Sequence, residues 1–249
     1  MMRLIRAELL KLFTVRTTYV TLAIGLILAA FFSFYVLGYR TTADVVSPDK
    51  IAGDLRLLIG QLVFFPGLLA ALLVTNEYRY NTIMYTLTSA TGRLKVFLAK
   101  LAVVSLFAVA VTLAFALIAG LLIHAGVAAR GFDMAAQNIP YLDLLWKIAF
   151  SGWAYAMFAL IFAFIIRNQI GAIVALLFLP GTIEGLLSLL LRENTKYLPF
   201  TALGNVLGVG GGMPQVAVLS PGKSALVVLA YVLGGLLIAA LLFKRRDAS

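Results

Sequence analysis

The chain has 249 residues, of which 63% are hydrophobic and 12% are charged, and its mean hydropathy is +1.04. Soluble domains carry about 25% charged residues, so this composition indicates a chain whose solvent is lipid. With no cysteine and one histidine, the sequence excludes disulfides, thiolate metal sites and histidine clusters. The net charge of +10 comes from basic residues beside the apolar runs. That pattern orients membrane proteins and does not form a nucleic-acid-binding face.

Residues 1–16 are expected to form an amphipathic helix. Four apolar residues share one helical face and three basic residues lie elsewhere: Ile5, Leu9, Leu12 and Phe13, against Arg3, Arg6 and Lys11. Such a helix lies in the membrane interface, with its basic side chains near anionic headgroups. The alternative is the frayed start of the first membrane span.

Six apolar stretches are long enough to span a membrane as helices, which takes about 20 residues each. They cover roughly 17–38, 57–75, 96–125, 143–166, 170–191 and 224–243. The third is long enough to tilt or to project from the bilayer. Only Arg167, Asn168 and Gln169 separate the fourth from the fifth, which predicts a tight hairpin. The fold class is therefore an all-α integral membrane protein, with one transmembrane domain over 1–249.

Basic residues predict the orientation of these spans. With the N-terminus inside, twelve Lys and Arg residues fall in inside segments and eight in outside segments. Because inside loops of membrane proteins are enriched in basic residues, both termini are expected in the cytoplasm. The outer segment 192–223 is apolar enough to be partly re-entrant, and non-helical backbone at that depth must be buried in protein or line a cavity.

The polar stretch Asn76–Lys100 interrupts the apolar sequence after the second span. Tyr80, Met84 and Leu87 fall on one helical face, while Tyr78, Thr82 and Tyr85 fall on another. A break at Thr91-Gly92 would separate two short surface helices, the second starting near Arg93. Aromatic, amphipathic helices of this kind serve as anchors for protein partners. The alternative is a solvated loop whose basic residues only enforce topology.

Glu184 lies within the fifth predicted span, where an ionisable residue is a candidate functional site. The alternative is a structural acid that is solvated or has a partner. Nearby, Pro180 predicts a kink, and Gly181 and Gly185 form a pair of small residues that permits close helix approach. That approach would be either to a second subunit or within one subunit.

We find no catalytic motif in the sequence. Pro221-Gly222-Lys223-Ser224 resembles the end of a phosphate-binding loop, but Ala217 stands where that loop requires glycine. No Ser–His–Asp set is plausible either. The chain is therefore expected not to be an enzyme and to bind neither ATP nor a metal by itself.

The order of features resembles the type-two ATP-binding-cassette (ABC) permeases, the membrane subunits of bacterial export systems. The resemblance covers nearly the whole chain. It rests on LIRAELLKL before the first span, NEYRYNTI after the second, GRLKVFLAK leading into the third, the tight hairpin, and YLPFTALGN before the last. The family often has glycine where this chain has Asn81.

This resemblance implies a dimer of permeases with separate cytoplasmic ATPase subunits, which would carry ATP and Mg²⁺. It places the protein in the bacterial inner membrane. The loop over 76–95 would be the coupling helix, centred on Glu77–Ala90, and the N-terminal helix would touch the ATPase. The coupling residues would be Glu77, Tyr78, Arg79, Tyr80, Thr82, Ile83, Met84, Tyr85 and Leu87. The pathway or gate would involve Glu184, Pro180, Gly181 and Gly185.

The expected function is thus an ABC export permease that couples a partner's ATP hydrolysis to alternating access. One alternative is an ion-driven secondary transporter, which would need ionisable groups near the bilayer midplane, where Glu184 comes closest. A second is a membrane scaffold or sensor that transports nothing. The sequence does not identify a substrate.

Overall fold

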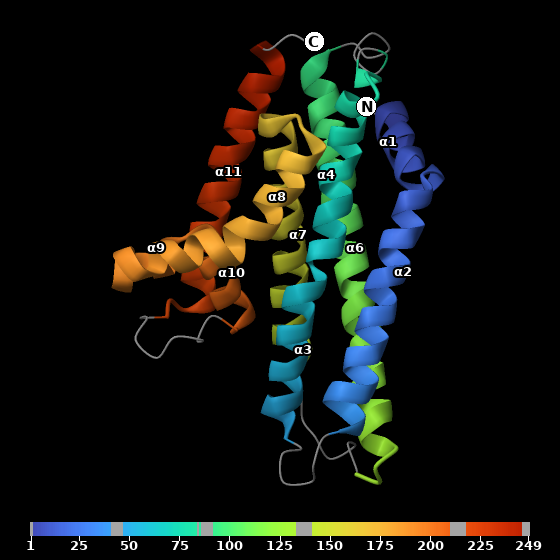
Figure 1. The fold of residues 1–249 in the computed structure, drawn as a ribbon, viewed down its shortest axis with the longest axis vertical. Helices are drawn as coiled ribbons and strands as arrows, with labels where there is room; N and C mark the ends of the chain where they lie inside the picture. The colour runs from blue at the N-terminus through green and yellow to red at the C-terminus, as the bar shows by residue number, and fades with distance from the viewer. Residues whose placement is uncertain are drawn as a thin grey trace.

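The computed structural model of the protein describes residues 2–40, 47–83, 85, 92–132, 141–209 and 218–245. Every element in these ranges is helical, and six stretches are long and apolar enough to cross a membrane. These stretches are Arg16–Tyr39, Asp49–Arg79, Arg93–Ala128, Tyr141–Ile166, Gln169–Tyr197 and Pro221–Arg245. The predicted all-α, six-span fold is confirmed. The N-terminal helix (Met2–Thr14) and the last turns of the C-terminal helix (Pro221–Arg245) lie at one end of the bundle, here called the terminal end (Figure 1).

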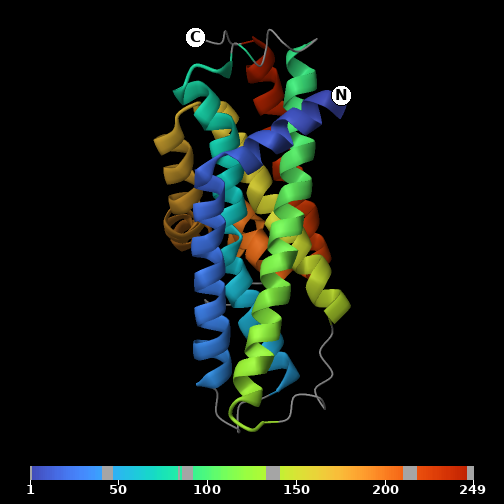
Figure 2. The same ribbon diagram turned by 90° about the vertical axis from the view of Figure 1, so that its right-hand side faces the viewer.

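The N-terminal segment forms a helix of its own, α1 (Met2–Thr14). Val15 has an extended backbone, which separates α1 from α2 (Arg16–Ala30) and its continuation η1 (Phe31–Tyr39). Figure 2 shows α1 running obliquely across α6 (Arg93–Ala128), while α2 runs along the bundle. The separate amphipathic helix is therefore confirmed, and α1 is not the frayed start of the first span.

The second span begins earlier than predicted. Helix α3 (Pro48–Leu62) continues through Val63 into α4 (Phe64–Arg79), so the predicted start of the second span at residue 57 is wrong, and the helix begins at residue 48. The start of α3 has strong helix signals, since Ser47 caps the helix by accepting from the backbone N–H of Lys50, and Pro48 occupies the first turn. The charged residues Asp49 and Lys50 lower the hydrophobicity of this turn, so a count of apolar residues does not predict the start of the helix, although its apolar face is buried.

Helix α6 is the longest element and α7 (Tyr141–Ile166) is the most buried span. The 36 residues of α6 extend about 54 Å at 1.5 Å per residue, whereas the 25 residues of α11 (Pro221–Arg245) extend about 38 Å. The lower parts of α3 and α6 consequently reach well beyond the start of α11 (Figure 1). The predicted projection of the long third span is consistent with this difference.

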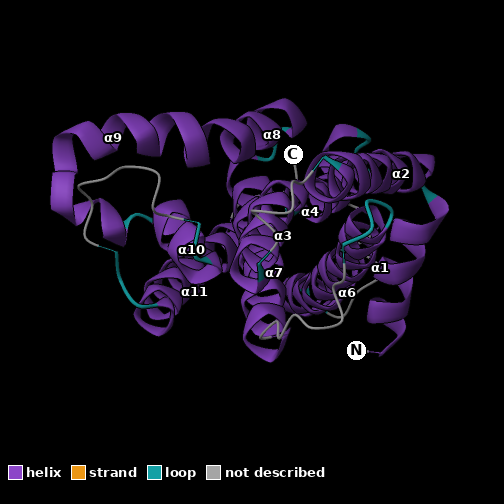
Figure 3. Cartoon of the chain, turned by 90° about the horizontal axis from the view of Figure 1, so that it is seen from below, coloured by secondary structure: helices purple, strands orange, loops and turns teal. Residues whose placement is uncertain are grey.

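The fifth span is bent. Helix α8 (Gln169–Phe178) passes through the π-helical turn η3 (Leu179–Ile183) into α9 (Glu184–Leu191), and η4 (Arg192–Tyr197) follows. Pro180 has no backbone N–H to donate, so the regular helix is interrupted there. As a result α9 lies across the long axis of the bundle (Figures 1 and 3). The kink predicted at Pro180 is confirmed, but 170–191 is not one straight helix.

Helix α10 (Pro199–Leu207) packs against α7 and α11. Its residues Phe200, Leu203 and Val206 are buried in the protein core. The apolar segment before the last span is thus covered by protein in this part, as a re-entrant segment requires. Residues 210–217 of the same segment lie outside the described residues.

Candidate functional site

Four charged side chains meet at the terminal end, where α1 crosses α6 and α4 ends. The Nζ atom of Lys100 lies 2.7 Å from Glu8 and 2.8 Å from Glu77, and Nζ of Lys11 lies 2.7 Å from Glu8 and 2.5 Å from Glu77. Lys100 is completely buried, and the exposed fractions of Glu8 and Glu77 are 2% and 5%. We call these four residues the charge cluster. It joins three helices that are distant in the sequence.

Helical periodicity explains why these charges are buried. Glu8 falls on the same face of α1 as Ile5, Leu9 and Leu12, and that face packs on the core. Lys100 occupies the buried face of α6 together with Val96 and other apolar residues. Sequence reasoning did not predict the ion pair between Glu8 and Lys100. A usable signal was present, because Glu8 lies three residues after Ile5 and therefore on the apolar face of the helix.

The charges of the cluster cancel, because two ammonium groups face two carboxylates. Burying an ion is costly unless a partner of opposite charge and further hydrogen bonds compensate for its lost hydration. The outer member, Lys11, retains 37% exposure of its side chain. Burial by itself would lower the pKa of Lys11, but the carboxylates of Glu77 and Glu8 outweigh it and raise that pKa above its ordinary value.

The end of α4 is fixed by a C-terminal capping motif. The backbone N–H of Thr82 donates to the carbonyl of Glu77 at 2.9 Å, and that of Asn81 donates to Tyr78 at 3.3 Å. Asn81 has a φ of 53°, the left-handed conformation that such a cap requires. Asparagine tolerates this conformation better than most residues. Asn81 therefore supplies the turn for which glycine is the usual residue.

The predicted coupling residues divide into a buried and an exposed set. Glu77 belongs to the charge cluster and Ile83 is buried, whereas Tyr78 is half-buried with the Arg167 guanidinium 5.2 Å from its ring centre. Arg79, Tyr80, Thr82 and Tyr85 are exposed. The exposed fractions of Tyr80 and Tyr85 are 64% and 77%.

Two further coupling candidates, Met84 and Leu87, lie outside the described residues, as does the predicted break at Thr91. The helix predicted to start near Arg93 is α6 itself, whose first residue is Arg93. The tight hairpin is also confirmed, with Asn168 capping α8 by accepting from the backbone N–H of Gly171. Arg79 donates to Gln169 in this hairpin at 2.9 Å, so the end of α4 is tied to it.

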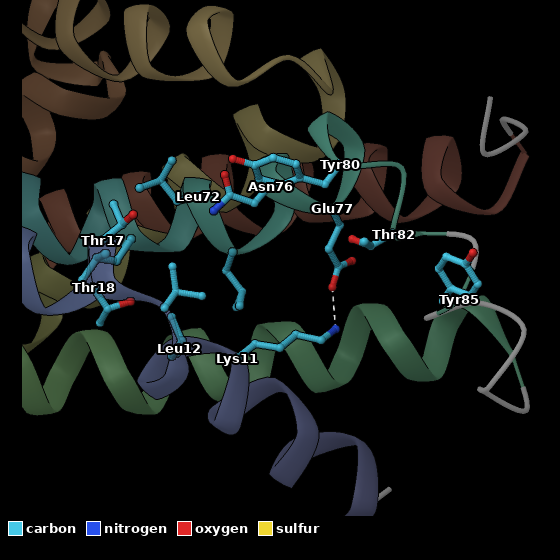
Figure 4. Close-up of a pocket in the computed structure, with 13 residues that line it drawn as sticks. Lys11, Leu12, Thr17, Thr18, Leu72, Asn76, Glu77, Tyr80, Thr82 and Tyr85 are labelled. Atoms are coloured by element: carbon cyan, nitrogen blue, oxygen red, sulfur yellow. Dashed lines mark hydrogen bonds and ion pairs between the residues drawn. The ribbon is translucent and has the colours of Figure 1, made fainter.

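A cavity of about 500 Å³ adjoins the charge cluster, between the corner of α1 and α2 and the last turns of α4. Its wall includes apolar side chains of α1 and α4 and polar groups near the end of α4. Figure 4 shows Leu72, Thr17 and Thr18 towards one end and Tyr80, Thr82 and Tyr85 towards the other. Glu77 and Lys11 line the cavity between them.

Glu184, the predicted gate residue, has protein partners. Its carboxylate accepts from the backbone N–H groups of Phe200 at 2.8 Å and Thr201 at 2.7 Å, and from the Thr201 hydroxyl at 2.8 Å. Phe200 and Thr201 lie in the first turn of α10, where backbone N–H groups have no partner within their helix. Glu184 therefore caps α10 from another helix, which favours the structural alternative.

Gly181 and Gly185, the small residues on either side of Glu184, have open space beside them in the described part of the chain. A methyl group placed on Gly181 or Gly185 would meet no other atom within 4 Å. These glycines therefore do not provide a tight helix contact inside this subunit, and their contact with a second subunit stays a prediction. No group of three or more acidic or histidine side chains in the described ranges is arranged to hold a metal ion.

A protein-family model described as "Protein of unknown function (DUF2705)" matches residues 23–249. The chain belongs to this family. The DUF2705 match includes Glu77, Lys100 and Glu184, whereas Glu8 and Lys11 precede it. No curated protein matched the chain. With its six candidate spans, this DUF2705 member is a multi-pass membrane protein.

Proposed function

We propose that the protein is the permease subunit of an ABC exporter, which forms the membrane path and takes its energy from a separate ATPase. The charge cluster is the observation that carries this proposal. It connects α1 and the end of α4 to α6, the longest helix, directly beneath the exposed residues that follow α4. A partner that pushes on those residues would move the three helices together.

The exposed part of this region suits a protein partner. Tyr80 and Tyr85 present large aromatic side chains. Arg79 adds a positive charge, and its guanidinium is oriented by a hydrogen bond to Gln169. Aromatic residues and arginine dominate the binding energy of protein interfaces. The cap at Asn81 and the buried Ile83 fix the backbone on either side of Thr82. A backbone that is already ordered lowers the entropic cost of binding.

The partner is expected on the cytoplasmic side. The basic residues Arg79, Arg93, Lys244 and Arg245 lie near the terminal end together with α1, and basic residues favour the cytoplasmic face. In this arrangement ATP and Mg²⁺ belong to the partner, and the permease carries out no covalent step. For ATP hydrolysis to drive transport, the ATPase must bind two conformations of the permease with different affinities. A second permease copy would complete the path, in the inner membrane of a bacterium.

Co-purification tests this proposal. The tagged protein is extracted from its native host in lipid nanodiscs, and the Mg-ATP hydrolysis of the purified complex is measured. We expect a co-purified ATPase, and we expect Tyr80→Ala with Tyr85→Ala to reduce both its recovery and the hydrolysis. Each lost aromatic anchor should cost about 1–2 kcal/mol of binding, roughly tenfold in affinity.

Tyr141→Ala is the matched control, because Tyr141 is 50% exposed at the opposite end of the bundle. It should leave both readouts unchanged. Recovery of the intact protein without any ATPase would contradict the proposal and would favour a scaffold or an ion-driven transporter.

A further inference from the structure

The cavity beside the charge cluster is amphipathic along its length. Leu69, Leu72 and Leu73 of α4 line one end, and Asn76 and Glu77 follow one to two turns later on the same helix. From Leu69 to Glu77 the rise is about 12 Å at 1.5 Å per residue. Ligand cavities of about 300–1,000 Å³ with an apolar wall and a few placed polar groups are typical of small-molecule sites. The cavity volume of about 500 Å³ lies in this range.

One oxygen of Glu77 has no hydrogen-bond donor in the described part of the chain. Oε1 accepts from both Lys11 and Lys100, but Oε2 is buried and makes no hydrogen bond. A buried carboxylate oxygen without a donor carries a desolvation penalty. Glu77 lines the cavity, so a ligand donor that reaches Oε2 from the cavity would remove this penalty.

The charges around Glu77 favour a neutral hydrogen-bond donor on the ligand over a charged one. Its two lysine partners already cancel the charges of Glu77 and Glu8. A ligand ammonium at Oε2 would add a third positive charge beside two ammonium groups, and a ligand carboxylate would face two carboxylates. A hydroxyl donates to Oε2 without adding charge. Asn76, whose side-chain amide can both donate and accept, also lines the cavity beside Glu77 and suits a neutral polar head group.

We propose that this cavity binds a neutral membrane amphiphile with a hydroxyl-bearing head group and one acyl chain, of the monoacylglycerol type. The head group donates to Oε2 of Glu77, and the chain lies along Leu69, Leu72 and Leu73. The apolar end of the cavity reaches into the second candidate span, so the ligand enters from the bilayer. All described lining residues belong to one chain, so binding can be tested without the proposed ATPase, although Tyr80 and Tyr85 line the cavity as well.

Photolabelling of the full-length protein alone, in nanodiscs, tests the site. The probe is a monoacylglycerol with a diazirine in its acyl chain, and labelled peptides are identified by mass spectrometry. We expect label on the segments containing Leu12–Thr18 and Leu69–Glu77. Unlabelled 1-monododecanoylglycerol should compete about tenfold better than dodecylammonium or dodecanoate, in line with one hydrogen bond to a charged group.

Leu73→Trp fills the apolar end of the cavity, one helical turn before Glu77, and it should reduce labelling of both segments about tenfold, a loss of about 1.4 kcal/mol. The control is Leu233→Trp, the same change at a side chain of α11 that is 60% exposed. It should leave labelling unchanged. Three results would each overturn the proposal. They are label spread evenly over all lipid-facing helices, equal labelling of the Leu73→Trp protein and the wild type, and better competition by either charged compound.

Discussion

Lys100 of α6 and Glu8 of α1 are 92 positions apart in the chain, yet they form a 2.7 Å ion pair in which both side chains are buried. This pair seats the N-terminal helix on the bundle. Because Lys100 also contacts Glu77, the same ammonium group joins α1 to the end of α4. The position of α1 is therefore coupled to the turn that presents Tyr80 and Tyr85.

Removal of Lys100 should be strongly destabilising. Lys100→Met leaves two buried carboxylates with Lys11 as their remaining partner in the cluster, and losing one member of a buried ion pair costs about 3–5 kcal/mol. The measurement is the free energy of unfolding in lipid bicelles. Lys50→Met is the matched control, because Lys50 pairs with Asp54 near the surface and such pairs contribute about 0–1 kcal/mol. Equal losses for the two variants would contradict the buried cluster.

The contribution of Lys11 to the free energy of unfolding should decrease at alkaline pH. Its pKa is raised in the folded state, so its contribution is fully present below the unfolded value of 10.5 and is lost as pH rises through the folded value. Unfolding free energies of the wild type and Lys11→Met are compared between pH 7 and 12. The difference should be constant up to about pH 10 and then shrink. A difference that grows at high pH would reverse the assigned sign.

Glu184 should stabilise the start of α10. Glu184→Ala leaves the first-turn N–H groups of Phe200 and Thr201 without their acceptor, and loss of a helix cap costs about 0.5–2 kcal/mol. Amide hydrogen exchange should accelerate in α10 and not in α6. In contrast, Glu193→Ala removes an exposed acid of η4 and should leave exchange in α10 unchanged. Unaltered exchange in the Glu184 variant would argue against the cap.

Asn81 should accept glycine but not a β-branched residue. At a φ of 53°, Asn81→Val should lose about 1–2 kcal/mol, because the left-handed conformation brings Cβ too close to the following carbonyl. Asn81→Gly should fold with nearly unchanged stability. The readouts are thermal unfolding and recovery of the proposed ATPase partner. Similar behaviour of both variants would mean that the α4 cap does not need this conformation.

Gly126 should not tolerate a side chain. A methyl group there would collide with the backbone carbonyl oxygen of Phe34, where α6 and η1 pack closely. Since backbone atoms cannot move aside easily, Gly126→Ala should cost about 1–3 kcal/mol or more by overpacking. Gly185→Ala serves as the comparison, because nothing lies within 4 Å of its added methyl group. Both unfolding free energies are measured in bicelles, and equal values would contradict the close packing.

The sequence by itself determined the six-span all-helical fold, the kink at Pro180 and the turn between α7 and α8, whereas the structure decided that α1 is separate from the first span. The features that the sequence determined depend on local chemistry: apolar length, helical periodicity, proline's missing N–H and an asparagine cap. Where charges fell on an amphipathic helix, as at Asp49 and Lys50, the same reasoning placed the start of the second span too late.

Only the tertiary structure decided which charged residues are partners. Glu77 stood out in the sequence as a surface coupling residue, yet it is buried against Lys11 and Lys100. Glu184 stood out as a gate, yet it caps a helix that begins fifteen positions later, at Pro199. The physical reason is that the desolvation cost of a charge depends on which helices pack around it, and helix packing is set by contacts between residues distant in the chain.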